Sequence, residues 1–157
     1  MPGIISRWIL SRVLASGLAF EHEAIDAYRG MRERMMKSGA CDEALESSIC
    51  HLLEEEETHR KILTDAAEGG LSGAELERMQ SGHLFTRAAA IRPLRGAELE
   101  RWRPDLVHAL DQEEKTWIFY GNLRRLSKIP AVKKAFALLA SMEKEHVDIL
   151  RRLLGLA

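Results

Sequence analysis

The sequence predicts an all-α protein, a four-helix bundle made of two antiparallel helical hairpins joined by a long crossover. Apolar residues recur at helical spacing in four segments, at about residues 4–37, 43–68, 104–127 and 130–154. No stretch alternates apolar and polar residues as a half-buried strand does. Only a few residues separate the first segment from the second and the third from the fourth. Each pair is therefore expected to fold back on itself.

Turn and capping residues predict where these helices begin and end. The first helix is expected to end at Ser38-Gly39, and the second to begin after Asp42, which can act as its N-cap. Gly69-Gly70 is expected to end the second helix. Pro104 and Pro130 suit the first position of the third and fourth helices.

The segment 70–103 lies between the two predicted hairpins and is too long for a tight turn. It predicts a crossover that runs the length of the bundle, so the second and third helices need not be antiparallel neighbours. Residues 71–79 and 96–102 can form short helices within it.

Composition excludes several classes of protein. The chain has 157 residues, which predicts one domain over residues 1–157, and 23 basic residues balance 24 acidic ones. This balance argues against nucleic-acid binding, which requires a basic surface. The two cysteines, Cys41 and Cys50, are too few for a disulfide framework or a cysteine-ligated metal. We therefore expect reduced thiols in a cytoplasmic protein.

The N-terminal segment is apolar and has no acidic residue up to residue 20. It could form a presequence or a membrane-surface helix, but charged interruptions argue against a signal peptide. No segment approaches the roughly 20 apolar residues that span a bilayer, so a membrane partner is not expected. We expect this segment to begin the first helix. Its excess of apolar residues indicates either a homodimer or packing on the crossover, and the choice stays open; these residues include Ile4, Ile5, Trp8 and Ile9.

One pattern occurs twice and is the most informative feature of the chain. A glutamate is followed seven residues later by a tyrosine, and the next helix carries Glu-x-x-His. The first copy is Glu21, Tyr28, Glu56 and His59, and the second is Glu113, Tyr120, Glu143 and His146. These residues fall where helical periodicity places the core, and carboxylates are rarely buried without a partner.

Four carboxylates and two imidazoles in one core indicate a site for two metal ions. Residues i and i+3 share a helix face, so each Glu-x-x-His pair offers an oxygen and a nitrogen to one ion. Glu21 and Glu113 can bridge or cap the two ions, and two divalent cations cancel the charge of four carboxylates. This ligation suits iron or manganese, and zinc or cobalt can also bind.

The tyrosines of the pattern have two interpretations. Tyr28 and Tyr120 lie two helical turns beyond Glu21 and Glu113, where each hydroxyl can hydrogen-bond a carboxylate ligand from a facing helix and fix its orientation. Alternatively, they are core tyrosines satisfied by some other acceptor.

A lone Glu-x-x-His is a weak signal, since the acidic run at 54–57 can simply be solvated. The second copy fixes the register, because Glu143 has the required spacing from His146 and Glu56 is its counterpart. The other histidines carry no such pattern and are expected at the surface or in the crossover; they are His22, His51, His83 and His108.

The four helices resemble the ferritin-like superfamily, most closely its rubrerythrin-like branch. The similar stretches are AFEHEAIDAY (19–28), EEETHRKIL (55–63), DQEEKTWIFY (111–120) and MEKEHVDIL (142–150). This resemblance implies a ferritin-like four-helix bundle with a carboxylate-bridged di-iron site that reacts with hydrogen peroxide or dioxygen. The implied iron ligands are Glu21, Glu56, His59, Glu113, Glu143 and His146.

The chain departs from the pattern of the families that it resembles at several points. Rubrerythrins add a rubredoxin-like domain with four cysteine ligands, so the resemblance implies an external electron donor here. They also carry a glutamate three residues after the third-helix ligand, where this chain has Thr116. Glu57 stands where haem-binding bacterioferritins have methionine. We expect a di-iron peroxidase or ferroxidase; iron storage and substrate hydroxylation are the alternatives.

Overall fold

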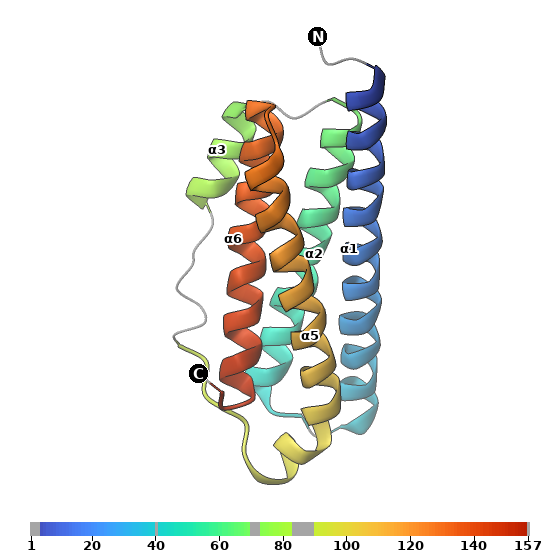
Figure 1. The fold of residues 1–157 in the computed structure, drawn as a ribbon. Coiled ribbons are helices and arrows are strands. Elements are labelled where there is room, and N and C mark those ends of the chain that lie inside the picture. The colour runs from blue at the N-terminus through green and yellow to red at the C-terminus, as the bar shows by residue number, and fades with distance from the viewer. Residues whose placement is uncertain (1–3, 40, 70–72, 83–89, 157) are drawn as a thin grey trace.

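The computed structural model describes residues 4–39, 41–69, 73–82 and 90–156. They form helices and contain no strand, as the sequence predicts (Figure 1). The helices are α1 (Ile4–Ser38), α2 (Glu43–Ala67), α3 (Gly73–Gly82), α5 (Gly96–Leu126) and α6 (Pro130–Leu153).

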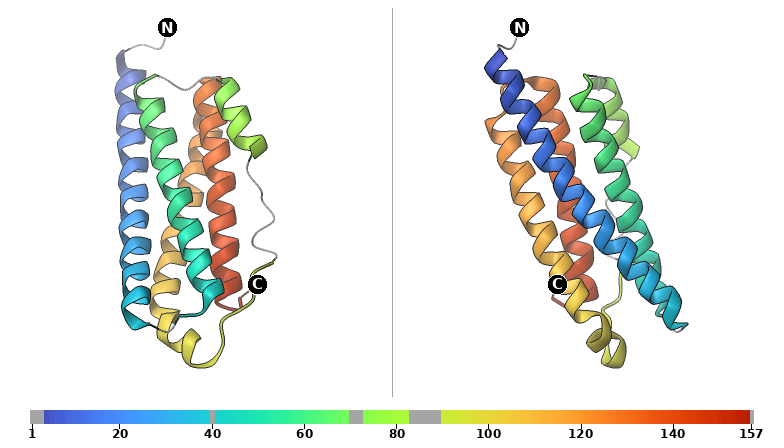
Figure 2. Two further views of the ribbon diagram at one scale, coloured as in Figure 1. Left: turned by 180° about the vertical axis from the view of Figure 1, so that it is seen from behind. Right: turned by 90° about the vertical axis from the view of Figure 1, so that its right-hand side faces the viewer.

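The four long helices pack as two hairpins. Helices α1 and α2 contact each other along their length, as do α5 and α6. Helix α1 also contacts α5, and α2 contacts α6, so the four helices form a ring in which neighbours run antiparallel (Figures 1 and 2). Each of the four therefore presents one face to a shared interior.

The predicted capping residues lie at the end of α1 and at both ends of α2. The Asp42 side chain accepts a hydrogen bond of 3.0 Å from the Leu45 N–H at the start of α2. Gly39 after α1 and Gly69 after α2 have φ of 66° and 74°, a conformation that glycine adopts without steric cost. Pro130 occupies the first turn of α6, as predicted.

The predicted start of the third helix is wrong. Helix α5 begins at Gly96 rather than at Pro104, and residues 96–102 are its first turns rather than a separate helix. Pro104 removes one helical N–H donor, and the first turns of α5 (yellow) lie at an angle to the rest (Figure 1). Burial of Trp102 and Leu106 on either side of the proline compensates for that loss.

The connection between the hairpins is shorter than predicted, running from residue 68 to 95 instead of 70 to 103. Helix α3 contains residues 73–79 of the short helix predicted at 71–79 and continues to Gly82, while residues 71 and 72 lie outside the described residues. It packs against α6, on the outside of the bundle (Figure 2). Near the other end, the Leu94 N–H donates to the Leu153 carbonyl at 2.9 Å and ties the crossover to the end of α6.

The core divides into two apolar clusters. One contains Met31, Leu45 and Leu106, near the turn between α1 and α2, and the other contains Leu14, Ile62 and Phe136 towards the opposite end. Along each helix, the predicted metal-binding residues fall between members of the two clusters. A polar layer is therefore enclosed by apolar packing above and below.

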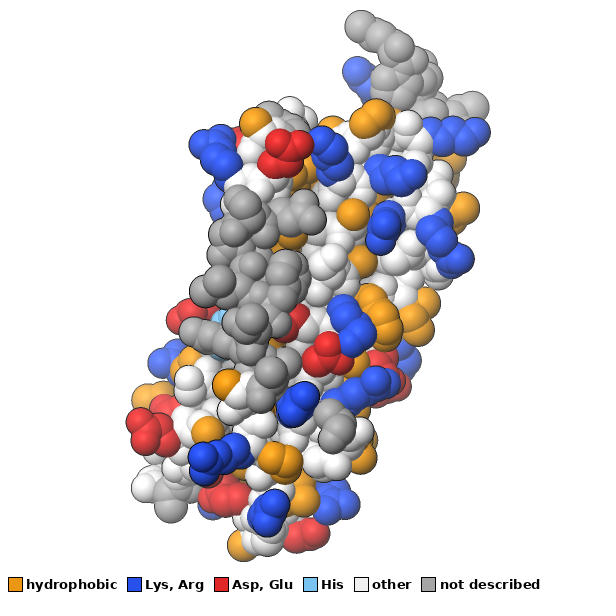
Figure 3. Space-filling view, turned by 90° about the vertical axis from the view of Figure 1, so that its left-hand side faces the viewer, with side chains coloured by type: hydrophobic (Ala, Val, Ile, Leu, Met, Phe, Trp, Pro, Cys, Tyr) orange, Lys and Arg blue, Asp and Glu red, His pale blue; other side chains and the backbone are white. Residues whose placement is uncertain are grey.

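The beginning of α1 keeps part of its apolar surface exposed. Trp8 is 59% exposed and Ile9 is 51% exposed, while the side chains of Ile4 and Ile5 lie outside the described residues. Lys and Arg side chains gather towards this end of the molecule, and the other half mixes both charges (Figure 3). None of the described helices combines the length and hydropathy that crossing a bilayer requires.

Candidate metal centre

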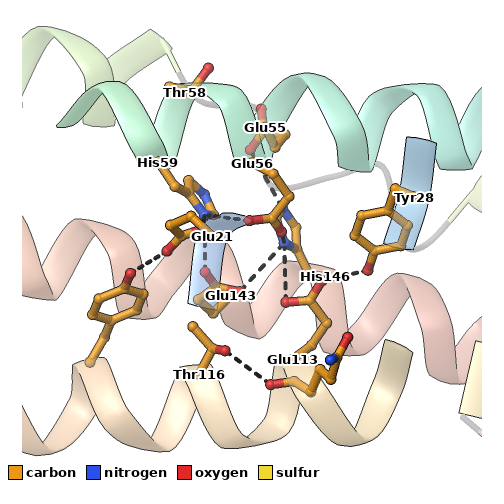
Figure 4. A network of polar contacts seen from close by, with 12 residues as sticks. Glu21, Tyr28, Glu55, Glu56, Thr58, His59, Glu113, Thr116, Glu143 and His146 are labelled. Carbon is orange, nitrogen blue, oxygen red and sulfur yellow. Dashed lines mark hydrogen bonds and ion pairs between the residues drawn. The ribbon is translucent and has the colours of Figure 1, made fainter. Parts of the chain in front are cut away.

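The structure brings all six predicted metal-binding residues into the polar layer (Figure 4). Each helix of the ring contributes to it, and the six side chains are 0–2% exposed. They are Glu21 from α1, Glu56 and His59 from α2, Glu113 from α5, and Glu143 and His146 from α6. Ligand atoms of Glu56, His59, Glu143 and His146 all lie within 4.8 Å of one another.

One half of the centre surrounds the Nδ1 atom of His59. This nitrogen lies 3.0 Å from Glu143 Oε1, 3.4 Å from Glu56 Oε2 and 3.4 Å from Glu21 Oε2. A single imidazole proton can point at only one of these three oxygens. One nitrogen and three oxygens thus converge on one small volume.

The other half repeats this arrangement around the Nδ1 atom of His146. That nitrogen lies 2.8 Å from Glu56 Oε1, 3.5 Å from Glu143 Oε2 and 3.7 Å from Glu113 Oε2. The two halves are related by the repeat in the sequence, with Glu113 in the place of Glu21. The imidazole rings lie nearly parallel, with centroids 5.0 Å apart.

The glutamates divide into two kinds. Glu56 and Glu143 each present one oxygen to the His59 half and the other to the His146 half. Glu21 faces only the first half, and Glu113 only the second. The sequence left open whether Glu21 and Glu113 bridge or cap; in this geometry each would cap one ion, and the Glu-x-x-His glutamates would bridge the two ions.

Two divalent cations fit these halves. Ligands bound at 2.0–2.2 Å to one ion lie about 3.0–3.5 Å apart in octahedral or tetrahedral geometry, close to the separations around each Nδ1. The polar atoms of the centre also lack hydrogen bonds: both carboxylate oxygens of Glu56 and Glu143, and both nitrogens of His59 and His146. Leaving such atoms buried and unpaired is costly, and metal ligation removes that cost.

Crowding of the carboxylates shifts their pKa values. Burial, reinforced by the charge of Glu56, raises the pKa of Glu21 to about 8. Burial and the charge of Glu143 raise the pKa of Glu113 to about 7. Burial alone would lower the pKa of each imidazole, but the surrounding carboxylates raise it for both His59 and His146. Without cations, the centre therefore holds protons in their place.

The two tyrosines hold the capping glutamates across the bundle. The Tyr28 hydroxyl donates to Glu113 Oε1 (Figure 4). The Tyr120 hydroxyl donates to Glu21 Oε1. Burial and the neighbouring carboxylate raise the pKa of both phenols, which keeps them protonated donors. Each capping glutamate thus has one oxygen fixed by a tyrosine and the other facing a histidine.

Gly17 makes room for one of these tyrosines. A Cβ atom at this position would lie 3.3 Å from the Tyr120 hydroxyl oxygen and 3.2 Å from Leu63 Cδ1. Both distances are shorter than ordinary van der Waals contacts. A larger residue at position 17 would therefore displace the hydroxyl that holds Glu21.

A cavity of about 270 Å³ reaches the centre between α1 and α5. Phe20 and Glu23 line it from α1, and Glu113 and Thr116 line it from α5. The Thr116 hydroxyl donates to the Gln112 carbonyl of its own helix at 3.0 Å, so it is turned towards the helix backbone. The cavity therefore borders the Glu113 side of the centre.

The sequence missed a second group of ligand-type residues. His51 and Glu55 on α2 and Glu145 on α6 each offer an atom within 4.8 Å of the others. His51 was expected at the surface or in the crossover, but it is half-buried between two helices. His22 and His108 are exposed, in agreement with the prediction, and His83 lies outside the described residues.

Comparisons of this chain with family models, with curated proteins and with solved structures found no match. The case for a metal centre therefore rests on its geometry: a buried group of two glutamates and two histidines that could hold a metal ion.

Proposed function

We propose that the chain is a ferritin-like, rubrerythrin-like di-iron carboxylate protein, a non-haem oxidoreductase that reacts with hydrogen peroxide or dioxygen. One observation carries the proposal. Two equivalent sets of one nitrogen and three oxygens share Glu56 and Glu143, each of which offers one oxygen to either set. A single ion would use only one of these two sets. Two neighbouring ions would each use one set and share the two carboxylates.

The charges and donor types favour iron. Four carboxylates and two neutral imidazoles balance two divalent cations, and mixed oxygen and nitrogen ligation suits iron or manganese, with zinc as a substitute. When bound, two ferrous ions supply one electron each, and these two electrons with two protons reduce one hydrogen peroxide molecule to two water molecules.

The protein's own residues would position and isolate this chemistry. Tyr28 and Tyr120 keep Glu113 and Glu21 oriented, because a fixed second oxygen limits how far each carboxylate can turn. The apolar clusters above and below exclude bulk water, so the charges at the centre interact strongly. Neither tyrosine is placed to bind an ion itself while it donates to a glutamate.

The openings around the centre favour a small oxidant over an organic substrate. The cavity beside Glu113 is partly polar, with Glu23 and Lys115 at its walls. An apolar cavity of about 160 Å³ lies near Leu14 and Phe136, and none of the six metal-binding residues lines it. A hydroxylase needs an apolar pocket beside the ions, so peroxidase or ferroxidase chemistry fits better.

The proposal includes an external electron donor. Cys41 and Cys50 are both free, and two thiols cannot supply the four thiolates of a rubredoxin-type iron. After each reaction with oxidant, electrons would therefore reach the centre from a donor outside these 157 residues. The exposed apolar end of α1, with Trp8 and Ile9, is where we place the contact of a homodimer.

Anaerobic titration with ferrous iron tests the proposal. We expect the chain to bind two ferrous ions, and peroxide or dioxygen to produce ferric absorption in the near-ultraviolet at a rate that Glu56→Ala abolishes. Glu57→Ala is the matched control, because Glu57 is the next residue but pairs at the surface with Arg29 and Arg60. Binding that stops at one ion, or that Glu56→Ala leaves unchanged, would refute the di-iron proposal.

A further inference from the structure

A second ligand cluster lies on the face of the bundle between α2 and α6. His51 and Glu55 are four residues apart on α2, so they share one helix face, and Glu145 faces them from α6. Their ligand atoms lie within 4.8 Å of one another. Three ligands spread evenly around one ion at about 2.1 Å are about 3.6 Å apart, so each ligand atom would move inward by up to about 0.7 Å to bind.

The repeat in the sequence does not explain this cluster. The two Glu-x-x-His motifs are offset by 87 residues (143 − 56), and the same offset relates His51 to Leu138, Glu55 to Met142 and Thr58 to Glu145. Leu138 and Met142 are buried in an apolar cluster. The second hairpin therefore packs with apolar residues where the first has ligands, and the fold itself does not require the ligands.

Burial separates the roles of the three residues. The carboxylate of Glu145 is nearly enclosed, with 4% of the residue exposed, whereas His51 and Glu55 are half-buried. Part of the surface of the other two residues is exposed, so the cluster lies near the outside of the bundle.

Glu55 also connects the cluster to the metal centre. Its Oε2 atom lies 4.0 Å from His146 Nε2, the ring nitrogen that faces away from the centre (Figure 4). When His146 binds an ion through Nδ1, its Nε2 carries the proton and faces this carboxylate. Glu55 therefore lies between this cluster and the His146 half of the metal centre.

From these contacts we infer that His51, Glu55 and Glu145 form a third site for a divalent cation. Two carboxylates neutralise the ion, and the imidazole favours a first-row transition metal such as ferrous or manganous ion over magnesium or calcium. Three protein ligands leave further positions to water, so this ion binds more weakly than the two in the centre. The inference goes beyond the proposed function, because the third ion can bind whatever reaction the pair performs.

Manganese titration tests the third site without any turnover. Free Mn²⁺ is followed by electron paramagnetic resonance as it is added to metal-free protein, and bound ions are counted per chain. We expect two tightly bound ions and one weaker ion in the unaltered protein. His51→Ala and the nearly isosteric Glu145→Gln should each remove the weaker ion and retain the two tight ones. His108→Ala is the matched control, since this exposed histidine belongs to no ligand cluster among the described residues.

A further variant separates this inference from the proposed function. The double variant Glu56→Ala, Glu143→Ala should lose both ions of the metal centre and keep one weakly bound ion. Adding His51→Ala to this double variant should remove the weakly bound ion. If the unaltered protein binds only two ions, or if His51→Ala and Glu145→Gln leave all three, the third site does not exist. If the pair fails to load but one weak ion depends on His51, the proposed function fails and the third site stands. Circular dichroism verifies that each variant keeps its helical content.

Discussion

The division of the glutamates into bridges and caps makes a prediction that other arrangements do not. Glu143 offers an oxygen to both halves of the centre, at 3.0 Å from His59 Nδ1 and 3.5 Å from His146 Nδ1. Glu21 faces only the His59 half, at 3.4 Å. Glu143→Ala should therefore abolish binding of both ions, whereas Glu21→Ala should leave one.

The size of the effect follows from linkage between binding and folding. An ion at 100 times its Kd stabilises the folded state by about 2.7 kcal/mol, so two ions contribute about 5 kcal/mol. In a chain of this size, 1 kcal/mol shifts Tm by about 2–4 °C, which gives about 10–20 °C for the unaltered protein. Glu21→Ala should retain about half of that shift, and Glu143→Ala less than about 4 °C.

The assay compares Tm with manganese and with a chelator, for each variant separately. The cavity and the altered charge left by alanine are present in both measurements and cancel in the difference. Glu57→Ala serves again as control and should show the full shift. Equal losses in Glu21→Ala and Glu143→Ala would refute the bridging geometry, as would a Glu143→Ala protein that still gains half of the shift.

Further predictions concern the groups around the centre. Tyr120→Phe removes the hydrogen bond to Glu21 and should weaken one ion about 10–100-fold, measured by competition with a chelator. Gly17→Ala should weaken the same ion by displacing the Tyr120 hydroxyl, whereas Gly121→Ala, whose added Cβ meets nothing within 4 Å, should not. The pKa of Glu21 is raised to about 8 and that of Glu113 to about 7, so the protonated acids stabilise the metal-free fold in acid. This stabilisation is complete below about pH 4.5 and is lost as pH rises through 7 and 8, so denaturant unfolding of the metal-free protein should show lower stability at pH 8 than at pH 5.

Each of these predictions has a result that contradicts it. The reasoning about Gly17 fails if Gly17→Ala weakens the ion as much in a Tyr120→Phe background as in the unaltered protein, since the displaced hydroxyl is then absent. Undiminished affinity in Tyr120→Phe would show that Glu21 needs no orientation from this tyrosine. A metal-free protein that is more stable at pH 8 than at pH 5 would mean that the buried carboxylates carry no protons.

Much of the fold could be predicted because helical periodicity and capping residues are local signals. Asp42 and Gly39 act where the sequence places them. Pro104 misled the prediction, since a proline suits the first turn of a helix and the sequence does not show that burial of Trp102 keeps the chain helical through it. This compensation comes from tertiary packing, which a rule based on the proline alone does not include.

The centre was partly predictable for a similar reason. Repetition of Glu-x-x-His identified Glu56 within an acidic run that is ambiguous by itself. That its two oxygens face His59 and His146 depends on how four helices meet, which no spacing within one helix determines. His51 was missed because Glu145 lies 94 residues later (145 − 51) and neither residue belongs to the repeat.

The crossed tyrosines have a consequence for how the chain folds. Tyr28 of the first hairpin holds Glu113 of the second, and Tyr120 of the second holds Glu21 of the first. Each hairpin can form from contacts close in sequence, but docking one against the other brings like charges together before these hydrogen bonds exist. Cations or protons must therefore arrive with the docking step. The rate of docking should then depend on metal concentration or, in the metal-free protein, on pH, while helix formation within the hairpins depends on neither.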